Sequence, residues 1–146
     1  MESVLLSAHV VAGILFVGPI AVSTSLFPRY AAVVGDPERG SSDVAGALYR
    51  ITRVYGALAL AVPILGFILA AVQGRATEVW IIVAMALTVI AGGLLALQIA
   101  PRQREALDSP VAGPALRRLG MLAGIFNLLW TVVVVLMVVR PGSHLA

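Results

Sequence analysis

Histidine and methionine provide the side chains in this sequence that could hold a metal ion or a haem iron. His9 is the one histidine inside the long apolar segments, and neutral imidazole is the commonest protein ligand for metals. Met85 and Met137 are expected at a depth similar to that of His9, about 9 Å below the outer membrane surface. A histidine with one or two thioethers suits Cu(I) or a haem iron. We therefore take His9, Met85 and Met137 as candidate metal ligands and His9 as the candidate haem ligand.

A structural role is the alternative for each of these residues. Methionine commonly fills gaps between helices, and a single histidine can simply donate to a backbone carbonyl of a neighbouring helix. His144 is either a further ligand or a solvated side chain. The chain has no cysteine, which excludes thiolate ligands and disulfides, and it lacks the motifs of standard nucleophilic, zinc-protease or nucleotide chemistry. No catalytic residue is predicted, and an enzyme is the less favoured class.

Four stretches without Asp, Glu, Lys or Arg define the elements that must position these residues. They cover residues 3–28, 54–74, 79–101 and 119–139, and all the charged residues lie outside them. A helix needs about 20 apolar residues to cross the hydrocarbon core. The sequence therefore predicts a single all-α transmembrane domain, a four-helix bundle with spans of about 3–27, 54–74, 79–100 and 119–139.

The arginines predict the orientation of the bundle, because basic residues in short loops stay on the cytoplasmic side. The predicted loops 28–53 and 101–118 hold eight of the ten basic residues, and only Arg75 and Arg140 lie on the opposite side. Both termini are thus expected outside, and the use of arginine for all ten basic residues favours a bacterial cytoplasmic membrane. The residues expected to fix topology and to contact lipid headgroups are Arg29, Arg50, Arg53, Arg102, Arg104, Arg117 and Arg118.

The net charge of +3 and the pI near 10.2 are explained by these loop arginines, so no nucleic-acid partner is predicted and the bilayer is the expected surroundings. The first span carries Glu2 where a signal peptide would have a basic residue, and its apolar run is too long for one, so we expect it to remain attached.

Small residues are expected to hold the helices together, since lipid tails are as apolar as leucine. Gly120 and Gly124 form a GxxxG pattern, and Gly92 and Gly93 form a similar small face. They could serve packing within the chain, which we favour, or a dedicated dimer interface. Asn127 lies near mid-membrane and needs a partner on another helix.

Further features refine the expected helices. Pro19 and Pro63 should kink their spans, and Asp43 fits the N-cap of a helix that continues into the second span. In both halves a Pro-Arg pair follows the first span, and similar sequences, residues 46–50 and 113–118, precede the next span. This favours two repeated helical hairpins, although Pro and Arg commonly end membrane helices. Ser23, Thr24, Ser25 and Gln98 could line a polar crevice or bond to their own helices.

The segment from Leu5 to Gly18, with His9 early in it, resembles the opening helix of a loose bacterial group. This group contains copper-resistance D (CopD-like) domains, the HemJ-type protoporphyrinogen oxidase and uncharacterised integral membrane proteins. The resemblance covers about 25 residues as far as Pro28-Arg29, beyond which only the four-helix layout is shared. It implies a haem- or metal-binding role for His9. A HemJ-like enzyme would also have a lysine on its third span, and this chain has no lysine, which argues against that activity.

Three functions remain open from the sequence. The first is a non-enzymatic accessory or scaffold subunit that packs with itself or with a larger membrane complex. The second is a haem- or copper-handling protein that uses His9. The third is a carrier of a small neutral or lipophilic solute, with a crevice at Asn127 and Ser25; the lack of charged residues inside the spans argues against a proton-driven carrier.

Overall fold

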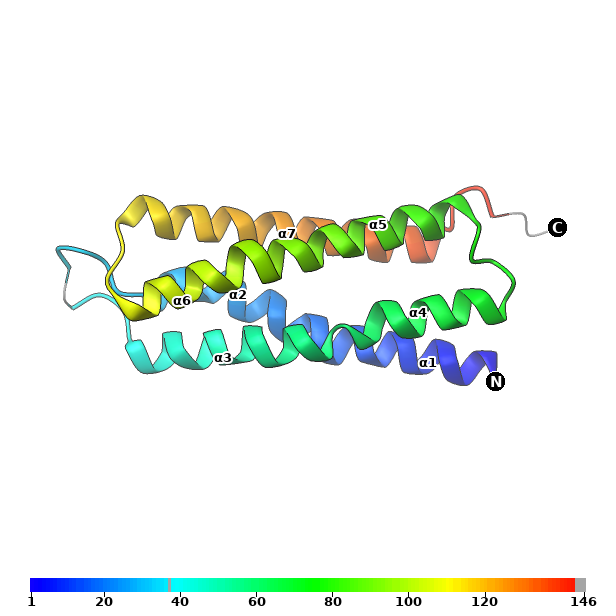
Figure 1. Cartoon of the computed structure of the whole chain (residues 1–146), viewed down its shortest axis with the longest axis horizontal. Helices are drawn as coiled ribbons and strands as arrows, with labels where there is room; N and C mark the ends of the chain where they lie inside the picture. The colour runs from blue at the N-terminus through cyan, green and yellow to red at the C-terminus, as the bar shows by residue number, and fades with distance from the viewer. Residues whose placement is uncertain (37, 144–146) are drawn as a thin grey trace.

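Four long helices make up the bundle shown in Figure 1. The computed structural model describes residues 1–36 and 38–143. Four helices in this part are long and apolar enough to cross a membrane: Glu2–Tyr30, Ser42–Val72, Val79–Asp108 and Gly113–Val139. The predicted all-α four-helix fold is confirmed, and the chain is a multi-pass membrane protein.

Three of the four long helices contain a segment that departs from regular α-helical geometry. The elements in order are α1 (Glu2–Ala12), the π-helical turn η1 (Gly13–Val17), α2 (Gly18–Tyr30), α3 (Ser42–Leu58), α4 (Ala61–Val72), α5 (Val79–Leu94), the π-helical turn η2 (Leu95–Ile99), α6 (Ala100–Asp108) and α7 (Gly113–Val139). Only α7 runs as one uninterrupted helix. Each irregular segment lies just before a proline, Pro19, Pro63 or Pro101, because proline lacks the amide that the helix ladder requires.

Two prolines lie just after a π-helical turn. Pro19 follows η1 and Pro101 follows η2, and the wider turn gives room for a ring that would otherwise strike the carbonyl four residues earlier. Pro63 lies at the start of α4, after a break at residues 59–60. There the Val62 amide donates to the Ala59 carbonyl at 3.0 Å. In a regular helix this carbonyl would accept from the amide of residue 63, which proline lacks. The helix thus departs from regular geometry beside both Pro19 and Pro63, where the sequence predicts kinks.

The helices extend beyond the predicted spans at the arginine-rich end. The first continues past Pro28 to Tyr30, and the third continues past Pro101 to Asp108. The N-cap prediction was wrong by two residues: Ser41 caps α3, its hydroxyl accepting from the Val44 amide at 3.4 Å, while Asp43 lies in the first turn. An acidic residue is still favourable there, because it faces the positive end of the helix dipole.

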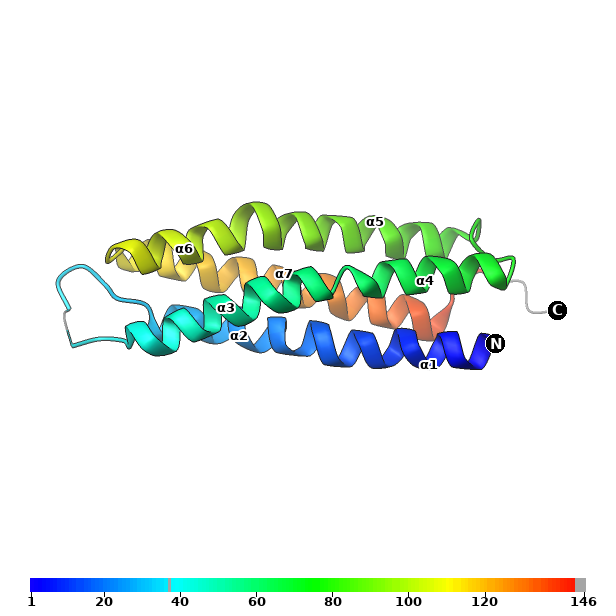
Figure 2. The same ribbon diagram turned by 60° about the horizontal axis from the view of Figure 1, so that its bottom comes forward.

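The helices pair in sequence order and then across the bundle. The first long helix packs on the second through α2 with α3 and α1 with α4, and the third packs on the fourth through α5 with α7. Contacts of α2 with α7 and of α3 with α6 join the two hairpins. Figures 1 and 2 show Met1 and the C-terminal end of α7 at the same end of the bundle, as four crossings require.

The packed core lies in the half of the bundle toward the arginine-rich connections. Its fully enclosed side chains come from all four long helices, with Phe27 on α2, Ile99 at the end of η2 and Phe126 on α7 among the largest. Trp130 packs against this cluster and meets the Phe126 ring edge-on, with centroids 6.3 Å apart. The other half also has buried apolar side chains, among them Val62, Ile81 and Val133, beside the polar contacts described below.

The two connections at the arginine-rich end are tied to each other. The Val34 amide donates to the Val111 carbonyl at 3.1 Å, and the Val111 amide donates to the Ala32 carbonyl at 3.3 Å. Gly40 completes the first connection with φ of +91°, and a Cβ at that position would strike the Tyr30 carbonyl. This turn therefore requires glycine, both for its backbone conformation and for the close approach of the α2 end.

We expect Gly40→Ala to lower the stability of the purified protein by more than the roughly 1–2 kcal/mol of a left-handed alanine, because it adds a backbone collision. Thermal unfolding in detergent measures the effect. Gly35→Ala is the matched control, since Gly35 also has positive φ but a Cβ there would meet nothing within 4 Å. Equal losses in the two variants would show that the contact with Tyr30 has no energetic role.

Candidate functional site

His9 links the first long helix to the second. The side chain is only 7% exposed, and its Nδ1 lies 2.9 Å from the Val62 carbonyl oxygen on α4. Because a carbonyl can only accept, Nδ1 must carry the proton and donate, and Nε2 then has the free lone pair. The bond thus fixes the tautomer as well as the position of the ring.

Gly66 allows this approach of the histidine. A Cβ built at Gly66 would lie 2.8 Å from His9 Cε1 and 3.2 Å from His9 Nδ1, closer than packed carbon atoms tolerate. The ring therefore lies directly on the backbone of α4, one turn after its Val62 acceptor. Sequence reasoning missed Gly66, although a glycine three residues after a membrane proline could have marked a close approach of another group.

The two candidate thioether ligands, Met85 on α5 and Met137 on α7, are both half-buried. Within the described residues, no hydrogen bond joins His9 to either sulfur, and no group of three or more His, Cys, Asp or Glu side chains could hold a metal ion. His144 lies outside the described residues. The metal and haem assignments of His9, Met85 and Met137 stay predictions.

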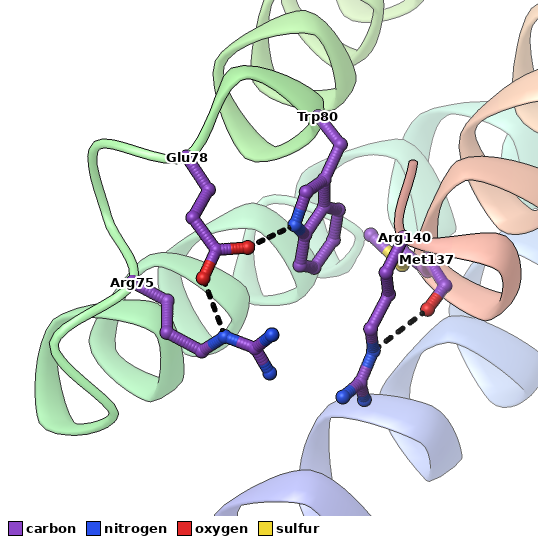
Figure 3. A network of polar contacts seen from close by, with 5 residues as sticks. All are labelled: Arg75, Glu78, Trp80, Met137 and Arg140. Atoms are coloured by element: carbon purple, nitrogen blue, oxygen red, sulfur yellow. Dashed lines mark hydrogen bonds and ion pairs between the residues drawn. The ribbon is translucent and has the colours of Figure 1, made fainter. Parts of the chain in front are cut away.

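A polar network closes the end of the bundle opposite the arginine-rich connections (Figure 3). Arg75 and Glu78, in the connection between α4 and α5, form an ion pair of 2.6 Å, and the Trp80 indole donates to the same carboxylate. The Arg140 guanidinium lies over the Trp80 ring, 5.9 Å from its centroid, and donates to the Met137 carbonyl at 3.2 Å. The network joins the α4–α5 connection to the end of α7.

The intramembrane hydroxyls and amides form separate pairs instead of one crevice. Ser23 on α2 and Thr52 on α3 are both buried, and their hydroxyls lie 3.0 Å apart. Asn127 on α7 donates from Nδ2 to Ser25 on α2 at 3.1 Å, which supplies the partner on another helix that its depth predicted. Gln98 accepts from Arg102. Each pair therefore ties neighbouring helices or turns together.

The glycines predicted to mediate packing are not covered by any other helix of the described chain. A Cβ at Gly92, Gly93, Gly120 or Gly124 would meet nothing within 4 Å, so close packing inside the chain does not require glycine at these positions. A role against another chain stays a prediction. The close helix contact occurs instead at Gly56, where a Cβ would lie 3.2 Å from Leu95 Cδ2.

The arginines predicted to contact lipid headgroups lie at the arginine-rich end, most of them exposed. Of the described residues, only Arg75 and Glu78 form an ion pair. A recess of about 600 Å³ opens between α6 and the start of α7, with Arg102 and Arg118 in its lining. A second, shallower one of about 330 Å³ lies along α2 beside Ser25.

Gln103 on α6 was also missed by sequence reasoning. It is fully buried, and neither its Nε2 nor its Oε1 has a hydrogen-bond partner within the described chain. Asn127 Oδ1 and Trp130 Nε1, one turn apart on α7, are likewise buried without a partner. An unpaired buried polar group destabilises a fold by about 1–3 kcal/mol, so these amide and indole atoms lower the stability of the bundle.

No protein-family model, curated protein or solved structure matches the chain. The assignment of a function therefore depends on the geometry of the chain itself.

We expect Gly66→Ala to destabilise the bundle by about 1–3 kcal/mol, because the new methyl group would displace the His9 ring. The cost should shrink in a His9→Ala background, where the ring is gone, and thermal unfolding of all four members of this cycle measures the coupling. Gly92→Ala is the control and should be neutral or slightly stabilising, since a Cβ there meets nothing within 4 Å. An identical cost of Gly66→Ala in both backgrounds would show that the two residues do not interact.

Proposed function

We propose that this protein is an accessory or scaffold subunit that packs, through the outward face of α7, against a second copy or another membrane protein. The observation that carries the proposal is a stripe of small and polar residues on this face. Gly120, Gly124, Asn127 and Thr131 follow one another at spacings of four, three and four residues, which places them on one side of a helix. Both glycines and Thr131 are exposed, and Asn127 is partly so.

Such a face suits a helix partner in lipid. Helix pairing there gains little from the hydrophobic effect, so it relies on close backbone approach over small residues and on polar contacts. The open space over Gly120 and Gly124 means that the chain itself does not use this groove. A partner helix could lie directly on the α7 backbone, with Thr131 within reach of its polar groups.

The other polar features support this function over a carrier. His9, Ser23 and Thr52 are engaged in contacts between helices. The two recesses described above are each lined by one helix or by one hairpin, whereas a carrier that works between the hairpins would line its path with both. We place the protein in a bacterial cytoplasmic membrane with both termini outside, on the strength of the arginine distribution.

Haem or copper handling is the second candidate, and the tautomer of His9 favours it. Because Nδ1 donates to Val62, the lone pair of Nε2 is the one available to a metal, and an ordering bond of this kind is typical of metal-ligating histidines. The resemblance of the first helix to the CopD-like and HemJ-like group agrees with this role.

For the scaffold function, we expect the double variant Gly120→Leu and Gly124→Leu to abolish the association. The bulky side chains would fill the groove and keep a partner backbone away. Light scattering of the protein in mild detergent measures self-association, and co-purification from membranes measures a larger complex. Ala57→Leu, which places the same bulky side chain at an exposed position of α3, should change neither. Unaltered assembly in the α7 variant would exclude this face as the interface.

For the cofactor function, we expect protein purified from its native membrane to show a Soret band or bound copper that His9→Ala removes. Absorption spectroscopy with elemental analysis measures both. Met85→Leu and Met137→Leu then test the thioethers, since loss of either one should weaken retention of the metal. Colourless, metal-free protein, unchanged by the histidine substitution, would rule the cofactor function out.

A further inference from the structure

The recess between α6 and the start of α7 combines an apolar floor with a cationic rim. Ala106 and Leu119 are buried and line it from the two helices, while Arg102 and Arg118 add two positively charged residues to the lining. Glu105 is the one acidic residue in the lining. An open recess lined by both apolar and positively charged residues suits an amphiphile with an anionic head.

The positive charge of this rim is not neutralised within the described chain. Neither Arg102 nor Arg118 has a carboxylate within 4.0 Å, Glu105 included, because the single ion pair of the described residues lies at the other end of the bundle. Arg102 is held in place by its own helix, donating to the Gln98 carbonyl at 3.1 Å and to the Gln98 side chain. A guanidinium has five N–H donors, so Arg102 can still donate to a ligand.

The N-terminus of α7 adds to the positive potential. This helix of 27 residues begins at Gly113 without a side-chain cap, and Pro114 and Ala115 of its first turn line the recess. The partial positive charge of a helix N-terminus favours a nearby anion. The two arginines and the helix end therefore act on the same space.

We propose that this recess binds the phosphate group of an anionic membrane lipid. Arg102 and Arg118 hold the phosphate, and the floor at Ala106 and Leu119 accommodates the glycerol and the first methylenes of the acyl chains. The position agrees with this ligand, because α6 and the start of α7 carry the charged residues that follow the third span and precede the fourth. The site is separate from the outward stripe of α7, so its existence does not depend on the proposed scaffold function.

Native mass spectrometry of the full-length protein with dioleoyl phosphatidylglycerol or dioleoyl phosphatidylcholine tests the proposal. We expect preferential binding of phosphatidylglycerol, and a loss of affinity of about fivefold for each arginine removed in Arg102→Gln with Arg118→Gln. The matched control is Arg104→Gln with Arg117→Gln, which removes the same charge from nearby positions of the same two helices that do not line the recess. The control should retain the wild-type preference.

A third variant, Ala115→Phe, fills the recess without changing its charge and should also reduce binding, which keeps the test valid should the arginine variant fail to fold. Equal losses in the two arginine pairs, or unchanged binding in Ala115→Phe, would overturn the site in favour of diffuse charge attraction. Inorganic phosphate is the remaining probe. If inorganic phosphate displaces phosphatidylglycerol as effectively as the lipid itself would, the apolar contacts of the lipid add no affinity. A soluble phosphate is then the ligand and the lipid assignment is wrong.

Discussion

The lack of a hydrophobic force between helices inside a bilayer is the constraint on which this structure depends. Apolar side chains drive the four helices into the membrane, but they gain little by meeting one another there. The helices must therefore be joined by shape and by a small number of polar contacts. In the half with the termini, the bond from His9 to Val62 and the ring over Gly66 join the first helix to the second, while the network around Glu78 joins the α4–α5 connection to α7. In the other half, packing around Phe27 and Phe126 has this role.

Most of the polar side chains inside the bundle are engaged in contacts between helices, so only a few features remain available for function. His9 had the strongest chemical signal in the sequence, and the structure shows it in a structural contact that also orients its Nε2. The hydroxyls of Ser23 and Thr52 and the pair of Ser25 with Asn127 serve interhelical contacts. What the fold leaves unused is the α7 face over Gly120 and Gly124 and the arginine-lined recess at one end. Both are suited to partners from the membrane, a helix in one case and a lipid in the other.

The number of helices could be predicted because charged residues are so costly in hydrocarbon that their absence marks each span. The ends of the helices could not be predicted from the positions of the charged residues. Arginines such as Arg29 and Arg102 continue a helix into the interface as readily as they end it, and the π-helical turns before Pro19 and Pro101 keep these prolines within continuous long helices. The role of each glycine was also hidden, because faces toward lipid and faces toward protein have the same apolar composition. Gly66 and Gly120 look alike in sequence, yet one lies under a histidine and the other faces outward.

The four-span bundle and its orientation are tested most directly by the sidedness of the two connections that must lie on opposite faces of the membrane. The chain has no cysteine, so Thr77→Cys and Ser109→Cys each introduce a single label site at an exposed position of a connection. A membrane-impermeant maleimide applied to intact cells should label the cysteine at position 77, and the one at position 109 should react only after permeabilisation. The reverse pattern would contradict the orientation inferred from the arginines, and labelling of both positions from the same side would contradict the four-span bundle itself.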